Sequence, residues 1–131
     1  MGTRSKIGIL KSDGKVDAIY CHWDGYPSYN GRMLVENYTK EEQIRKLISL
    51  GSISSLGKNL EQTNSYYSWR EEESPKIVYE NEQAYTKAYG DCWDEYDYLF
   101  KENEWFVYDN NTEFDGWVLV KEVLKEEEEE R

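Results

Sequence analysis

The strongest constraint on the fold is a pair of hairpin patterns, one near each end of the chain. In the first, residues 5–10 place Ile7 and Ile9 on one face of an expected strand, and Asp13-Gly14 leads into a second strand at residues 15–23. An Asp-Gly pair between two strand-like segments is a strong hairpin signal, because such tight turns favour residues that tolerate positive φ. The second strand carries apolar side chains on both faces, so we expect it to lie inside the sheet.

The second hairpin pattern lies in the C-terminal third of the chain. Residues 95–100 and 104–108 are strand-like and flank Glu102-Asn103. Strand residues alternate between the two faces of a sheet, so one face of the first segment would carry Tyr96, Tyr98 and Phe100. We also expect short strands at residues 77–79 and 116–120.

Three segments between and beside these strands favour helices. Residues 32–38 fit a short helix, and residues 81–89 fit another that ends at Gly90. Thr39-Lys40-Glu41-Glu42 has the form of a capping box, which begins a helix by satisfying its free N–H groups. The side chains at helical spacing after this box are Ile44, Leu47 and Ile48, and Gly51 fits the position just after the helix.

These patterns predict one α+β domain, which suits a chain of 131 residues. We expect a small antiparallel or mixed sheet, built from two hairpins plus a strand, with two or three helices packed on one face. The domain should span residues 1–125, with residues 52–75 forming a long loop or lid. Residues 126–131 are almost entirely Glu and are expected to be a disordered acidic tail.

The charge of the chain limits its partners. The formal net charge is −11, from 27 acidic and 16 basic residues, so we expect no direct binding to nucleic-acid backbones. Basic proteins and mimicry of a nucleic acid stay open. No apolar segment is long enough to span a membrane, and a signal peptide is not evident, so we expect a cytoplasmic protein in which Cys21 and Cys92 are reduced thiols.

Aromatic residues supply 15% of the chain, including 12 Tyr and five Trp. Tyr and Trp suit interfaces and sites that stack planar ligands, although they are also ordinary strand residues. We expect their exposed rings to be covered in a homo-oligomer. The candidate ligand-binding residues, which combine aromatic rings with hydrogen-bonding and cationic groups, are Arg4, Tyr20, His22, Trp23, Asp24, Tyr26 and Arg32. The alternative for the two arginines is a structural salt bridge.

Catalytic chemistry is less well supported by the sequence. Cys21 and His22 are adjacent on an expected strand and should point to opposite faces, so a Cys/His pair would need Cys92 instead. A hydrolase with an N-terminal nucleophile would need trimming beyond Gly2, which has no nucleophilic side chain. Metal ligation by His22, Asp24, Cys92 and Asp94 matches no zinc-motif spacing, and we expect neither metal nor cofactor.

Parts of the chain resemble a group of small hypothetical proteins found in bacteriophage and prophage genomes. The likeness rests on the opening Met-Gly-Thr-Arg-Ser, and on Tyr20-Cys21-His22-Trp23-Asp24-Gly25-Tyr26-Pro27 followed by Asn30-Gly31. It continues through residues 96–100 and 105–107, Trp117, and Val123-Leu124, and it omits residues 52–75. The resemblance implies an accessory phage protein acting in a bacterial cytoplasm, and many such proteins counter host defences.

Together these observations lead us to expect a non-enzymatic counter-defence protein that binds and sequesters a small nucleotide-type signal. The alternative is an acidic protein–protein inhibitor or DNA mimic that blocks a host defence protein. A Cys/His or N-terminal-nucleophile hydrolase is the third hypothesis.

Overall fold

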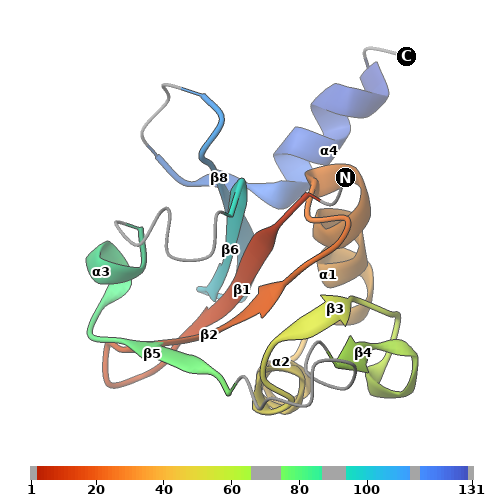
Figure 1. Ribbon diagram of the computed structural model, residues 1–131. Helices are drawn as coiled ribbons and strands as arrows, with labels where there is room; N and C mark the ends of the chain where they lie inside the picture. Colours follow the sequence, from red (N-terminus) through yellow and green to blue (C-terminus); the bar gives the residue numbers. More distant parts are fainter. Residues whose placement is uncertain (1–2, 66–74, 87–93, 113–115, 130–131) are drawn as a thin grey trace.

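The computed structural model of the chain describes residues 3–65, 75–86, 94–112 and 116–129. These residues form one mixed β-sheet with helices on both faces (Figure 1), which confirms the predicted α+β class. Seven strands follow the order β4-β3-β2-β1-β6-β7-β8, and β5 pairs with β2 off this path. The strands are β1 (Ser5–Leu10), β2 (Val16–Cys21), β3 (Ile53–Ser55), β4 (Asn64–Ser65), β5 (Ile77–Tyr79), β6 (Tyr96–Lys101), β7 (Glu104–Asp109) and β8 (Val118–Leu119).

Both predicted hairpins are present and meet at the centre of the sheet. Strand β1 pairs antiparallel with β2 and parallel with β6, so that Ile7 lies opposite both Ile19 and Tyr98. The first turn places Gly14 at φ 88°, and the second places Glu102 and Asn103 at φ 53° and 62°. As predicted, β2 is an interior strand, because β1 flanks it on one side and β3 and β5 on the other.

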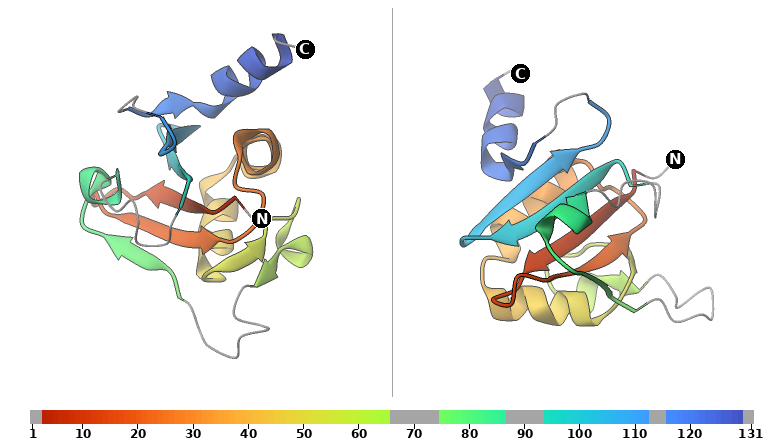
Figure 2. Two further views of the ribbon diagram at one scale, coloured as in Figure 1. Left: turned by 45° about the horizontal axis from the view of Figure 1, so that its top comes forward. Right: turned by 90° about the vertical axis from the view of Figure 1, so that its left-hand side faces the viewer.

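The main helices are α1 (Arg32–Asn37), α2 (Glu41–Ser49), α3 (Glu82–Thr86) and α4 (Val120–Glu129). Helices α1, α2 and α4 cover one face of the sheet, and α3 lies on the other, as the right-hand view of Figure 2 shows. The expected group of two or three helices on one face is therefore present as α1, α2 and α4, and α3 is an additional helix on the other face. Its residue Tyr85 is fully buried and packs against the second face with Val16 and Leu99.

The larger core lies between the sheet and α1, α2 and α4. Helix α2 contributes three buried side chains at helical spacing, as its sequence predicts, and Gly51 follows it at φ 78°. Its first residue is Glu41, with Lys40 at the N-cap, whose backbone N–H donates to Gln43 Oε1 at 3.3 Å. The helix therefore begins one residue later than the predicted capping box, and the prediction that Thr39 is the N-cap is wrong. The residue three positions after the observed N-cap is Gln43, whose side-chain oxygen accepts from the Lys40 N–H.

The structure corrects the expected long loop at residues 52–75 over its described part. Residues 52–65 contain β3, the short helix η2 (Leu60–Gln62) and β4. Asn59 Oδ1 caps η2 by accepting from the Gln62 N–H at 3.0 Å, and the Tyr38 hydroxyl donates to the Gly57 carbonyl at 2.8 Å. These polar contacts order a segment with few apolar residues. Residues 66–74 lie outside the described residues.

The expected disordered tail is also corrected, because residues 126–129 form the last part of α4. The helix is held by Val120 and Leu124, which are buried in the larger core. Packing of its first turns therefore extends the helix into the acidic run. Residues 130–131 lie outside the described residues.

Candidate functional site

The loop after β2 is held closely against the first residues of the chain. Asp24 has φ 57°, and the Gly25 N–H donates to the Thr3 carbonyl at 2.7 Å. A Cβ at position 25 would lie 2.7 Å from that carbonyl oxygen and 2.8 Å from Ser5 Cβ. Glycine is therefore required here by the close approach of two backbone segments.

Buried polar contacts with the sheet hold the same loop in place. The Tyr98 hydroxyl on β6 donates to the Gly25 carbonyl at 2.6 Å. Asn30 is fully buried, and its Nδ2 lies 3.4 Å from Ser5 Oγ and 3.3 Å from Cys21 Sγ. The loop is thus a preorganised part of the domain, followed directly by the short helix η1 (Pro27–Gly31) and α1.

Residues 22–29, which we call the aromatic loop and which include the first three residues of η1, expose several aromatic rings. Trp23, Tyr26 and Tyr29 are 43%, 38% and 36% exposed, and the only other large hydrophobic side chain exposed in the described parts of the chain is Val78. The His22 and Trp23 rings meet edge to face with centroids 4.6 Å apart, and Tyr26 and Tyr29 do so at 6.4 Å. Large apolar rings gathered in one exposed loop are typical of a binding surface.

The hydroxyl of Tyr26 stays protonated well beyond neutral pH. The negative charge of Asp24 raises the pKa of Tyr26, and the Tyr26 hydroxyl donates to Asp24 Oδ1 at 3.3 Å. Tyr26 therefore offers an apolar ring with a neutral polar tip, fixed by its acidic neighbour.

The structure brings together most of the predicted site residues. The Tyr20 hydroxyl lies 2.7 Å from His22 Nδ1, and His22 packs against Trp23, so these three form one chain of contacts. Asp24 and Tyr26 form a second pair in the same loop. Arg4 is half-buried just before β1, and its carbonyl accepts from the Glu95 N–H at 2.8 Å.

Arg32 has a different environment from the rest of the predicted site. Its guanidinium forms ion pairs with Glu36 at 3.7 Å and with Glu128 of α4 at 3.2 Å. Across the described ranges of the chain, the Arg4 side chain has no ion pair. Of the two arginines expected to bind a ligand, Arg32 therefore has the structural salt bridge that we considered as its alternative.

Helix α4 brings acidic charge to the side of the aromatic loop. It packs against both η1 and α1 (Figure 1). Its ten residues include five Glu and two Lys. Glu126, Glu128 and Glu129 are exposed. Exposed aromatic rings and exposed carboxylates thus lie on neighbouring elements.

A second polar group, which sequence reasoning missed, lies inside the domain. Lys6, Asp94 and Asp97 have fully buried side chains, with Lys6 Nζ 3.8 Å from Asp94 Oδ2 and 3.7 Å from Asp97 Oδ1. Asn110 Nδ2 donates to Asp97 Oδ2 at 3.1 Å and to Asp94 Oδ2 at 3.3 Å. We call Lys6, Asp94 and Asp97 the buried charge cluster.

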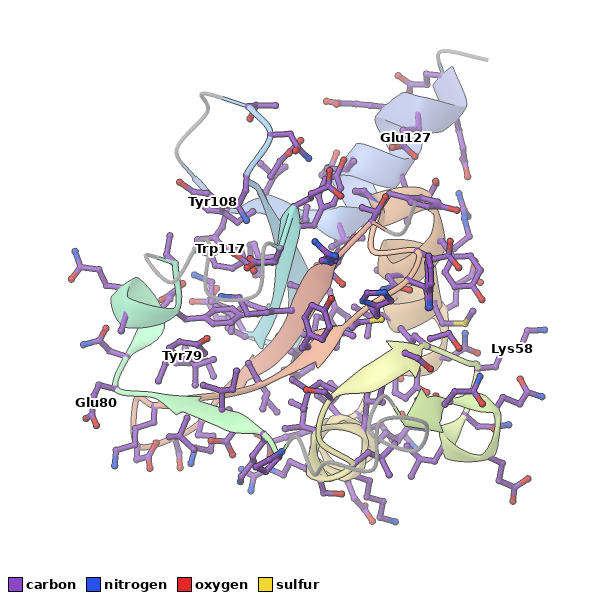
Figure 3. The ribbon with its side chains drawn as sticks, in the orientation of Figure 1. Lys58, Tyr79, Glu80, Tyr108, Trp117 and Glu127 are labelled. Atoms are coloured by element: carbon purple, nitrogen blue, oxygen red, sulfur yellow. The ribbon has the colours of Figure 1, made fainter. Side chains whose placement is uncertain are left out.

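Aromatic rings surround the ammonium of this cluster. Lys6 Nζ lies 5.3 Å from the ring centroid of Tyr79 and 5.2 Å from that of Tyr85, distances that allow cation–π attraction. The Tyr85 ring stacks on Trp117 with centroids 5.9 Å apart, and Trp117 meets Tyr108 edge to face at 5.5 Å. Figure 3 shows Tyr79, Trp117 and Tyr108 along the side of the sheet that carries α3.

The Cys21 thiol is buried and protonated at neutral pH. Burial raises the pKa of its thiol to about 11, and the thiol donates to the Trp23 carbonyl at 3.4 Å. His22 instead bonds with Tyr20 on the other face of the strand, as the alternation of side chains predicts. Cys92 lies outside the described residues, so neither its expected pairing with His22 nor its place in the considered metal set is described. In the parts of the chain that are described, no three His, Cys, Asp or Glu side chains are grouped to hold a metal ion.

Comparison with known proteins adds no family to this picture, since no family model, curated protein or solved structure matches the chain. Over the described ranges, none of the helices has the length and apolar character needed to cross a membrane.

Proposed function

We propose that the protein acts by non-covalent binding, with the aromatic loop and helix α4 forming a docking surface for a positively charged partner protein. The observation that carries this proposal is the exposure of Trp23, Tyr26 and Tyr29 in one loop of a chain with net charge −11. Tyr and Trp supply most of the binding energy at many protein interfaces, because they bury large rigid surfaces and keep a polar group at the edge.

The fixed backbone of the loop supports this role. Gly25 is held to Thr3 and to Tyr98 by short hydrogen bonds, so the loop is ordered before a partner arrives. Binding to a preorganised surface loses less conformational entropy than binding to a flexible one. The exposed rings can therefore contribute a larger share of their contact energy to affinity.

The neighbouring charges favour a basic partner. The exposed carboxylates of α4 lie beside the loop, and complementary charge mainly raises association rates and selects between partners. The resemblance to phage and prophage proteins favours a host defence protein as that partner. Where its basic surface binds nucleic acid, the acidic helix would occupy it as a DNA mimic.

A second candidate is sequestration of a small nucleotide-type signal by the same loop. It is favoured by the Tyr20–His22–Trp23 contacts and by the half-buried Arg4, whose side chain has no ion pair among the residues described. However, Arg32 is engaged by Glu128, so of the two predicted arginines only Arg4 keeps a guanidinium without an ion pair among the described residues. Two pockets among the described residues are lined by none of the aromatic-loop residues, and exposed rings without a concave site fit a protein surface better than they fit a planar ligand.

Native mass spectrometry of the full chain purified from bacterial cells tests both candidates. We expect a complex with a host protein that is lost in a Trp23→Ala, Tyr26→Ala variant and retained in Val78→Ala, whose substituted side chain is exposed elsewhere on β5. Release of a nucleotide at fixed stoichiometry would instead favour the second candidate. A host protein that binds equally well to the wild type, to the Trp23→Ala, Tyr26→Ala variant and to Val78→Ala would contradict the proposed surface.

A further inference from the structure

The buried charge cluster contains one cationic and two carboxyl side chains where the central strands meet. Lys6 on β1 lies in register with Asp97 on the parallel strand β6, and Asp94 lies just before that strand. None of the three side chains is exposed to solvent. Their charges therefore have to be balanced within the protein.

Full ionisation would leave this group unbalanced. With Lys6 charged and both carboxyls ionised, the interior would hold a net charge of −1, which is strongly unfavourable without solvent. In addition, Asp94 Oδ1 and Asp97 Oδ1 are buried and accept no hydrogen bond within the described residues. One proton on the pair would remove the net charge and supply a donor between the two carboxyl groups.

We propose that the Asp94–Asp97 pair holds a single proton in the folded protein at neutral pH, and that releasing this proton weakens the attachment of the aromatic loop. The cluster is then a built-in proton switch next to the backbone segments that hold the aromatic loop. It goes beyond the proposed function, because the switch exists whatever the partner is.

The electrostatics of the cluster support a shared proton. Burial raises the pKa of Asp97 to about 9, helped by its hydrogen bond with Asp94 and opposed by the charge of Lys6 and by the Asn110 amide. Among the described residues, the titratable or hydrogen-bonding groups that other elements bring to the cluster include four phenols and one amide. Tyr20 on β2 is in register with Lys6, and Tyr108 on β7 is in register with Asp97. The rings of Tyr79 on β5 and Tyr85 on α3 lie near the Lys6 ammonium. The amide is that of Asn110, which follows β7.

The backbone beside the cluster is the backbone that holds the loop. The residues that precede Lys6 carry the key carbonyls: Thr3 accepts from the Gly25 N–H at 2.7 Å, and Arg4 accepts from the Glu95 N–H at 2.8 Å. Glu95 in turn directly follows Asp94. Repulsion between two ionised carboxylates would therefore act on both segments that fix the loop.

The sign of the pH dependence follows from proton uptake. Asp97 keeps its proton when folded at pH values where an unfolded carboxyl has lost it, so folding takes up a proton. The contribution of this pair to stability is therefore present at low pH and is lost as the pH rises toward about 9. Asp17 behaves in the opposite way: burial acts against its charge, but its bonds to Lys76 and Lys11 lower its pKa.

The test is a carboxyl-carbon NMR titration of the folded full chain between pH 5 and about 10, with Asp97→Asn and Asp94→Asn as matched neutral variants. We expect one carboxyl of the pair to titrate far above the usual Asp range. The amide protection factor of Gly25 should fall with that titration in the wild type and stay constant in Asp97→Asn. Both variants keep every other titratable side chain, so the contributions of those groups cancel in the comparison.

Two results would overturn the inference. If both carboxyl carbons report ionised groups in the folded protein at pH 7, the pair holds no proton. If one carboxyl titrates high but the protection of Gly25 is unchanged, the proton exists and the coupling to the loop does not.

Discussion

The buried hydroxyl of Tyr98 donates a 2.6 Å hydrogen bond to the carbonyl of Gly25, which lies 73 positions earlier in the chain. This bond joins the central strand β6 to the aromatic loop. It explains how a loop with several exposed rings stays fixed. The strands that form the core thereby also position the proposed binding surface.

Replacing Tyr98 with Phe should destabilise the protein by about 1–3 kcal/mol, because the Gly25 carbonyl would be buried without its donor. Urea unfolding measures this change. Tyr29→Phe is the control, since the Tyr29 side chain is exposed and its hydroxyl makes only a 3.5 Å contact with the Leu56 carbonyl. Equal losses in the two variants would show that the buried bond has no special role.

Replacing Lys6 with Met should cost about 3–5 kcal/mol at pH 8, as expected when one partner is removed from a buried ionic group. The loss should shrink as the pH is lowered, because protonation can then neutralise the carboxyls that remain. Lys46→Met is the control, because Lys46 forms only an exposed pair with Glu42 on α2, and it should cost less than about 0.5 kcal/mol. A loss for Lys6→Met that does not change between pH 5 and pH 8 would contradict the charge assignment.

The thiol of Cys21 should resist alkylation in the folded protein. Burial raises its pKa to about 11, so little thiolate is present at pH 8 and the sulfur is also covered. Peptide mass spectrometry after iodoacetamide treatment should show Cys21 modified at least about 100-fold more slowly in the native protein than in urea. Rapid native labelling would mean that β2 opens readily or that the thiol is reactive.

Neutralising two exposed acids of α4, with Glu126→Gln and Glu129→Gln, should slow association with a basic partner and reduce the dependence of affinity on salt. Stability should hardly change, because both side chains are exposed. Surface plasmon resonance at two salt concentrations measures the effect. Lys121, which pairs with Glu104 at 3.0 Å, offers the opposite test, since Lys121→Gln should not slow association.

Local sequence patterns were sufficient to predict the elements that depend on short-range signals. The two turns place Gly14 and Asn103, residue types that tolerate positive φ, in that conformation, and α2 has its apolar residues at helical spacing. The segments that were mispredicted depend on distant contacts. Strand β3 joins β2 through the pairing of Ile53 with Cys21, 32 positions earlier in the chain, and the acidic end of α4 follows from packing at its start.

The candidate site likewise contains a part that local sequence predicts and a part that depends on distant contacts. The aromatic loop was predictable, because its residues are adjacent in sequence. The buried charge cluster was not, because Lys6 and Asp97 meet only through the parallel pairing of β1 with β6. The available signal was a charged residue inside each of two largely apolar strands, Lys6 in β1 and Asp97 in β6, which is unusual for strand interiors.

The most direct test of the proposed binding surface is photo-crosslinking in bacterial cells, with p-benzoylphenylalanine placed at position 26 and, as a control, at position 78. Both side chains are exposed, but only Tyr26 lies in the aromatic loop. The account predicts one dominant crosslinked protein from position 26 that is absent from position 78 and is lost when Trp23 is also changed to Ala. Crosslinks of equal pattern from both positions, or none from position 26, would contradict it.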